Sequence, residues 1–193
     1  MEYRRKWLPK EERGQAPKKL TRNSHETRMK LLSGGQSGVD RAVLDVGIAR
    51  GIDYGGWCPK DGWAEDLSAP PGLLAKYQRL KETPLADPAQ RTEWNVRDAD
   101  ACMIVIAAGG LAVSKGTALA EELAHRHRKP LLVVDLGDPE PVEHAALWLR
   151  VQQRRVSAGL VLAIGGPRES EAPGIYASAT VFIHALLDMA DRG

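Results

Sequence analysis

The sequence is poor in cysteine and in aromatic side chains, and it contains no long apolar run. Only two cysteines, Cys58 and Cys102, occur among 193 residues, without a C-x-x-C spacing. Neither a disulfide framework nor a metal site with familiar ligand spacing is therefore expected. No apolar stretch could cross a membrane, and none near the start resembles a signal-peptide core. We expect a soluble cytoplasmic protein with reduced, inert thiols.

An excess of charge of one sign is also missing, since the formal net charge is only +2. That small value hides an asymmetry: residues 1–29 hold nine Lys and Arg against four Glu, and residues 30–193 hold eighteen against twenty-one acidic residues. We expect 1–29 to be a basic, flexible N-terminal arm and 30–193 to be a single domain. The arm lacks interleaved aromatics, which disfavours a nucleic-acid-binding surface.

Glycine is abundant, and its most informative cluster is the stretch SGGQSGVDR at 33–41. A short apolar run precedes it, and apolar residues follow it at helical spacing up to Gly51. The pattern predicts a strand, a glycine turn and a helix, with Ser37 as the helix N-cap and Asp40 as an acidic first-turn residue. Amides at such a helix start could hold a phosphate, although a tight turn without a ligand remains an equal alternative.

Two further glycine turns follow predicted strands. The run 102–108 is apolar throughout, as in a parallel strand covered on both faces, and it leads through Gly109 to SKGT at 114–117. The strand at 160–164 leads to GGPRES at 165–170, where Arg168 offers a planar guanidinium suited to phosphate or carboxylate. A plain loop with a solvent-exposed Arg-Glu pair is the alternative at this third turn. We interpret the repetition of such turns as a sign of an anion site.

Between the first helix and the 102–108 strand, the chain predicts a short strand at 52–58, a long loop, an edge strand at 77–82 and one further helix. The loop 59–72 is rich in Pro and Gly and carries Lys60; it is either a binding loop or an ordinary Ω-loop. Asp87 and Pro88 then give an N-cap and first helical residue. On pattern alone Arg91, in that helix, is a surface charge.

Strands and helices alternate along 30–193, which predicts an α/β, Rossmann-like fold with a mostly parallel sheet and helices on both faces. Ligands of such sheets bind beyond the carboxyl ends of the strands. We therefore expect the three glycine turns to converge at one edge. No Ser-His-Asp order, metal-ligand set or isolated carboxylate pair is apparent, so binding is favoured over catalysis.

Five blocks of the sequence resemble the molybdenum carrier (molybdenum cofactor carrier protein) family. They are residues 33–42, 56–66, 80–84, 90–98 and 165–170, and the similarity extends over about 30–190. That family belongs to the SLOG superfamily of Rossmann-like proteins. The resemblance implies a homo-oligomer, a dimer or tetramer, that binds the molybdenum cofactor, protects it from oxidation and delivers it to molybdoenzymes. The metal would be held through this phosphorylated pterin rather than by protein ligands.

An enzyme of the same superfamily is the alternative. Around Arg91 the chain resembles Lonely Guy phosphoribohydrolases, which cleave nucleoside monophosphates and use a PGGxGTxxE motif. Here Gly116-Thr117 is followed by Ala120 where that glutamate would stand, with Glu121 one position late. One residue turns a helical side chain by about 100°, so Glu121 would face elsewhere. A sensor of a nucleotide-derived ligand is a third reading.

We accordingly predict no catalytic and no metal-ligating residues, and one anionic ligand with a phosphate. The predicted cofactor-binding residues lie in the three glycine turns, the 59–72 loop and the helix that follows it: Gly34, Gly35, Gln36, Ser37, Gly38, Lys60, Arg91, Ser114, Lys115, Gly116, Thr117, Gly166 and Arg168.

Overall fold

A computed structural model describes residues 29–107 and 110–192, and the fold is built from these. The predicted basic arm lies outside the described residues except for Met29, which begins the first strand. Among the described residues, no helix is both long and apolar enough to span a membrane.

Six strands form one sheet in which every pair is parallel, in the order β3-β2-β1-β6-β4-β5. The Rossmann-like fold expected from the sequence is therefore confirmed, and the sheet is parallel throughout. The strands are β1 (Met29–Leu32), β2 (Asp53–Cys58), β3 (Leu80–Glu82), β4 (Ala101–Ile106), β5 (Leu131–Asp135) and β6 (Leu160–Gly165). β6, the last in the chain, lies at the centre between β1 and β4.

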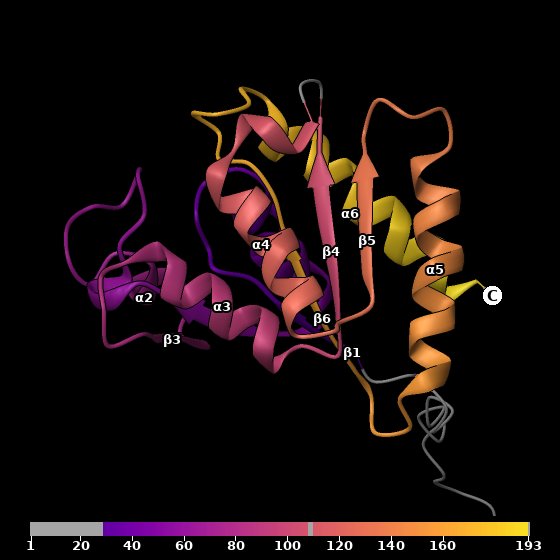
Figure 1. Ribbon diagram of the computed structural model, residues 1–193, viewed down its shortest axis with the longest axis horizontal. Coiled ribbons are helices and arrows are strands. Elements are labelled where there is room, and N and C mark those ends of the chain that lie inside the picture. Colours follow the sequence, from indigo (N-terminus) through magenta and orange to yellow (C-terminus); the bar gives the residue numbers. More distant parts are fainter. Residues whose placement is uncertain (1–28, 108–109, 193) are drawn as a thin grey trace, which may run out of the picture.

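Helices cover both faces of the sheet. Figure 1 shows α3 (Pro88–Asp98) and α4 (Lys115–Arg126) in front of the strands and α6 (Ile175–Asp191) behind them. The helices α1 (Val39–Arg50) and α5 (Pro141–Arg155) share the core on the α6 side. The connections contain α2 (Leu73–Lys76) and the short 3-10 turns η1 (Lys60–Gly62) and η2 (Gly110–Val113).

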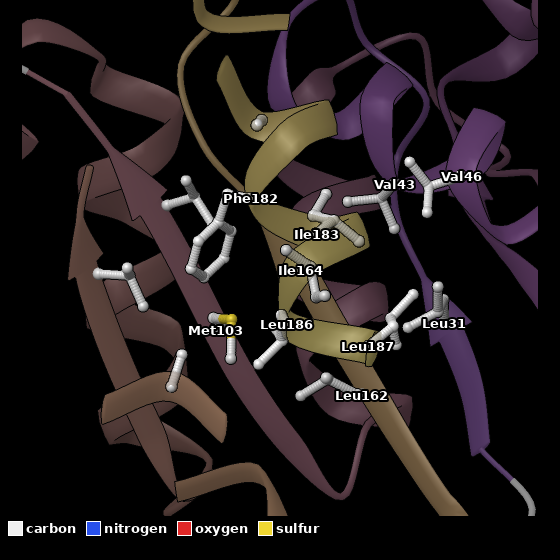
Figure 2. Close-up of a cluster of buried hydrophobic side chains, with 14 of the residues drawn as sticks. Leu31, Val43, Val46, Met103, Leu162, Ile164, Phe182, Ile183, Leu186 and Leu187 are labelled. Atoms are coloured by element: carbon white, nitrogen blue, oxygen red, sulfur yellow. The ribbon is translucent and has the colours of Figure 1, made fainter. Parts of the chain in front are cut away.

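Alternation along the central strands explains the two cores. Leu31 faces the large cluster under α1, α5 and α6, whereas Leu32 faces the smaller cluster under α3 and α4. Figure 2 shows the large cluster, with Leu31, Met103, Leu162 and Ile164 of the sheet against Phe182, Ile183, Leu186 and Leu187 of α6. A strand flanked by both cores must be apolar at every position, and all six residues of β4 are buried.

Helix ends and strand limits correct several expectations. Ser37 is not the N-cap of α1: Gly38 holds that position, at φ +74° and without a side-chain cap. Asp87 caps α3 as predicted, its carboxylate accepting from the Ala89 amide at 2.9 Å. The edge strand expected at 77–82 is confined to β3, and α5 starts at Pro141. β5 is one of the two outer strands of the sheet, so most of it is only half-buried.

Candidate functional site

The described residues of the three glycine turns lie at one edge of the sheet, as the sequence predicted. They follow β1, β4 and β6, which are neighbouring parallel strands, so their carboxyl ends point the same way. α1 leaves this edge towards one face of the sheet and α4 towards the other. A space between helices that diverge in this way is where α/β sheets bind ligands.

A cleft opens at this edge, and we call it the outer cleft. It encloses about 510 Å³ of empty space, its open mouth included. Seven of the predicted binding residues line it: Gln36, Arg91, Ser114, Gly116, Thr117, Gly166 and Arg168. An eighth, Gly34, lines an adjoining hollow instead. Residues from every glycine turn and from α3 therefore meet around one space.

The other five predicted residues line neither of these two spaces. Gly35 faces a third small core, where an added Cβ would lie 3.1–3.2 Å from three leucine side chains. A Cβ on Gly38 would come within 2.3 Å of the Pro167 carbonyl oxygen. Ser37 bonds within the chain, and Lys60 and Lys115 are exposed at the starts of η1 and α4. Gly35 and Gly38 thus allow close packing in this structure.

Arg91 is not the surface charge that the local pattern indicated. Its side chain is only 14% exposed, and its Nη1 donates to Asp40 Oδ2 at 2.9 Å. Gly34 makes room for it, because a Cβ there would lie 2.2 Å from Arg91 Nη1. Burial raises the pKa of Asp40 above its ordinary value, although the Arg91 charge and the Gln36 and Gly166 amides oppose the shift. A buried carboxyl group and a largely buried guanidinium therefore share the floor of the cleft.

Donors of the first glycine turn are largely engaged by the chain itself. The Ser37 amide donates to Gln36 Oε1 at 3.1 Å, and the Val39 amide to the Pro167 carbonyl at 3.2 Å. Ser37 Oγ donates to Glu65 Oε1, and the same carboxylate accepts from Ser170 Oγ at 2.6 Å. The protein's own Glu65 carboxylate and Pro167 carbonyl thus accept hydrogen bonds from residues at the start of α1.

Glu65 belongs to the 59–72 loop, which is fastened over the first and third turns. Gln36 Oε1 accepts from the Glu65 amide at 2.9 Å, and Arg41 makes two 2.9 Å hydrogen bonds to Asp66. Burial alone would raise the pKa of Glu65, but hydrogen bonds from Ser170 and Ser37 and the Arg168 charge lower it. These contacts tie the loop to the first and third turns, although none of its residues lines the outer cleft.

Arg168 contacts the 59–72 loop and also lines the cleft. Its guanidinium lies 3.9 Å from Glu65 Oε2 and 5.7 Å from the centre of the Trp63 ring, and its side chain is 32% exposed. The indole face attracts the cation and limits its rotamers. A cationic group with donors left over is therefore held at the mouth of the cleft.

The start of α4 presents the least occupied donors of the cleft. Ser114 is the N-cap, and its Oγ accepts from the Thr117 amide at 3.2 Å. The amides of Lys115 and Gly116 have no carbonyl partner within the helix because they precede its first full turn. Thr117 is 3% exposed, and its Oγ1 has no hydrogen-bond partner among the described residues. This end of the cleft therefore fits an acceptor-rich anion.

Sequence reasoning missed several cleft residues. They are Asp40, Pro88, Ala89, Thr92, Leu119, Ala120 and Gly165. Asp40 carried a signal, an acid in the first turn of a helix, but that pattern is equally satisfied by capping. The missed residues that belong to α3 and α4 carried no such signal, because only the packing of those helices shows which side faces the cleft.

Position 120 determines whether α4 brings a carboxylate into the cleft. Ala120 lines the cleft and Glu121 does not, so the position one turn past Thr117 carries a methyl group.

No cluster of three or more His, Cys, Asp or Glu able to hold a metal occurs within 29–107 and 110–192. Cys58 and Cys102 are buried, and burial raises the pKa of each thiol to about 11.

Comparisons with known proteins agree with this architecture. The profile of the circularly permutated YpsA SLOG family matches residues 31–187. A crystal structure of a protein named "putative molybdenum carrier protein" from Syntrophus aciditrophicus SB is 37% identical, with a TM-score of 0.70. The alignment covers 83% of this chain and 96% of that one. A search among curated proteins finds no match.

The strand order fits a circular permutation of a doubly wound sheet. If β6 and α6 are placed ahead of β1 and the strands renumbered, the sheet order β3-β2-β1-β6-β4-β5 becomes 4-3-2-1-5-6. The strands then run outward in both directions from the first, as in doubly wound nucleotide-binding sheets. Together with a profile match over most of its length, this shows that the chain belongs to the circularly permutated YpsA SLOG family.

Proposed function

We propose that the outer cleft binds the phosphate of an anionic small molecule, that this molecule is the molybdenum cofactor, and that the protein protects it and delivers it to molybdoenzymes. The observation that carries the proposal is the start of α4, which opens into a cleft that also contains Arg91 and Arg168.

The phosphate fits the start of α4 better than the start of α1. At α1, Glu65 and Pro167 already accept hydrogen bonds from the turn. At α4, two amides point along the positive end of the helix dipole, and Thr117 Oγ1 has no partner among the described residues. A phosphate there would accept from both amides and the hydroxyl, and Arg168 would supply a charge-assisted hydrogen bond at the mouth.

The molybdenum cofactor is the specific ligand that we propose because the similar Syntrophus protein bears the name of a molybdenum carrier. The cofactor brings its own sulfur ligands for the metal, so the chain needs to supply only donors for the phosphate and the pterin. Release to another protein requires that no covalent bond tie the cofactor to the chain. Assembly into a dimer or tetramer remains part of the proposal.

Hydrolysis of a nucleoside monophosphate is the alternative, and Asp40 beside Arg91 is the observation in its favour. That pair places a carboxyl and a guanidinium in the cleft, which a phosphoribohydrolase needs. The carboxyl, however, is already bonded to Arg91, and the position on α4 that could bring a second one is Ala120. We therefore favour binding without turnover.

Titration under anaerobic conditions separates the two functions. The purified protein is titrated with molybdenum cofactor, AMP and molybdate, and the AMP sample is analysed for adenine and ribose 5-phosphate. We expect the cofactor to bind, molybdate alone not to bind, and AMP to remain intact. Release of adenine and ribose 5-phosphate over repeated turnovers would contradict the carrier proposal and support the enzyme.

A further inference from the structure

A second hollow adjoins the outer cleft, between the sheet and the helices α3 and α4, and we call it the inner chamber. It encloses about 400 Å³, its opening included. Five residues line both spaces: Asp40, Arg91, Thr92, Ala120 and Gly165. The chamber and the cleft therefore meet at the ion pair between Arg91 and Asp40.

The walls of the inner chamber are mostly aliphatic. Leu32, Cys102 and Ala163 belong to the sheet, and Val96 faces them from α3. No Phe, Tyr or Trp is among the lining residues. A space between a sheet face and a helix layer has two opposed apolar walls, against which both faces of a flat ring can pack.

The polar groups on these walls are satisfied, with one exception. Asn95 bonds the backbone of Trp57 through both its amide nitrogen and its oxygen, and Thr92 Oγ1 donates to the Pro88 carbonyl. Ser33 is 2% exposed, and its Oγ has no partner among the described residues. Because an unpaired buried hydroxyl is unfavourable, a partner from outside the chain is expected there.

We propose that the inner chamber receives a fused heteroaromatic ring of the ligand, such as a pterin, and that Ser33 Oγ bonds a nitrogen or oxygen on the ring edge. The inference rests on the proposed function, because the phosphate stays at α4 while the ring passes Arg91. An acyl chain would leave Ser33 unpaired, whereas a heteroaromatic edge satisfies it. Ser33 and the aliphatic walls thus determine specificity for the ring and contribute nothing to phosphate binding.

Three stable probes test this arrangement by calorimetry: neopterin monophosphate, AMP and ribose 5-phosphate, the last of which lacks a ring. Ala163→Val narrows the chamber without touching the outer cleft, since Ala163 lines only the chamber. We expect it to weaken neopterin monophosphate at least tenfold and to change ribose 5-phosphate less than twofold. Ser33→Ala should weaken the ring-bearing ligand about fivefold and leave the thermal midpoint equal or higher.

The contrary outcomes are distinct. If both variants are folded and bind neopterin monophosphate within twofold of the wild type, the chamber is a packing void and the inference is overturned. If Ala163→Val does not fold, Ser33→Ala decides alone by the same criterion. Should AMP, but not neopterin monophosphate, bind more tightly than ribose 5-phosphate, the ring site stands and the pterin assignment fails. If neither binds more tightly, the ring site fails.

Discussion

Replacing Arg91 by methionine should destabilise the fold by about 3–5 kcal/mol at pH 7.5, the usual cost of leaving a buried charge without its partner. The estimate rests on the 2.9 Å hydrogen bond between Arg91 and Asp40. The side chain of Arg91 is 14% exposed and that of Asp40 is 4% exposed. For a domain of this size we expect a fall in the thermal midpoint of about 6–20 °C. Urea unfolding followed by circular dichroism measures the change.

The loss should depend on pH in a defined direction. Asp40 has a raised pKa in the folded chain, so the folded state holds its proton more tightly than the unfolded state, whose value is near 3.8. Stability therefore falls as pH rises from about 3.8 towards the folded pKa. Without Arg91 the pKa of Asp40 rises further, so the pH range over which its ionisation destabilises the folded state becomes wider. We expect the variant to be nearly as stable as the wild type near pH 4 and much less stable at pH 7.5.

A double-mutant cycle supplies the control. Asp40→Asn removes the buried charge, so Asp40→Asn/Arg91→Met should recover most of the stability lost in the single Arg91 variant. The reasoning fails if Arg91→Met costs less than about 1 kcal/mol, the range of an exposed pair. It also fails if the loss is the same at pH 4 and pH 7.5.

Three further expectations follow from the packing around the site. Gly35→Ala should lower stability by about 1–3 kcal/mol in urea unfolding, because φ is +72° and the new methyl meets a leucine cluster; an unchanged midpoint would contradict this. Asp66→Asn should speed amide hydrogen exchange in the 59–72 loop by removing the charge that Arg41 holds with two hydrogen bonds, whereas unaltered exchange would mean that the loop is fixed by other contacts. Cys58 and Cys102 should not react with Ellman's reagent at pH 8 until the protein is unfolded, since both are buried with pKa values raised to about 11; rapid labelling of the native protein would count against the fold.

Strand alternation and glycine turns predicted the fold because both are local signals. A buried parallel strand such as β4 must be apolar at every position, and a turn such as Gly34–Gly38 must be small wherever backbone and side chains approach closely. The insertion of β6 between β1 and β4 could not be read in this way. Strand order depends on which helices cover which face, and no single segment encodes it.

The edges of the candidate site were predictable from local patterns, whereas of the two residues on its floor only Arg91 was predicted, through a family resemblance. The local pattern at the start of α4 indicates a helix start without reference to the rest of the chain; it includes Ser114, Gly116 and Thr117. The pairing of Asp40 with Arg91 joins residues fifty-one positions apart, and each alone looks like a capping acid or a surface base. Only tertiary packing distinguishes Lys115, which points outward, from Arg168, which a tryptophan and a glutamate hold at the cleft.

The central claim is that a phosphorylated anion binds against the first turn of α4, and a pair of charge-matched variants tests it. Gly116 lines the cleft, and a Cβ there has only Ser114 Oγ within 4 Å, at 3.8 Å, so Gly116→Glu should fold well and even favour the helix. Ala118→Glu adds the same charge to the same helix at an exposed position outside the cleft lining.

The decisive measurement is anaerobic equilibrium binding of the molybdenum cofactor to the wild type and to these two variants. Our account predicts that Gly116→Glu loses binding by at least a hundredfold while Ala118→Glu stays within about threefold of the wild type. Equal affinity in all three proteins would contradict the account, because the cofactor phosphate could not then lie at the start of α4.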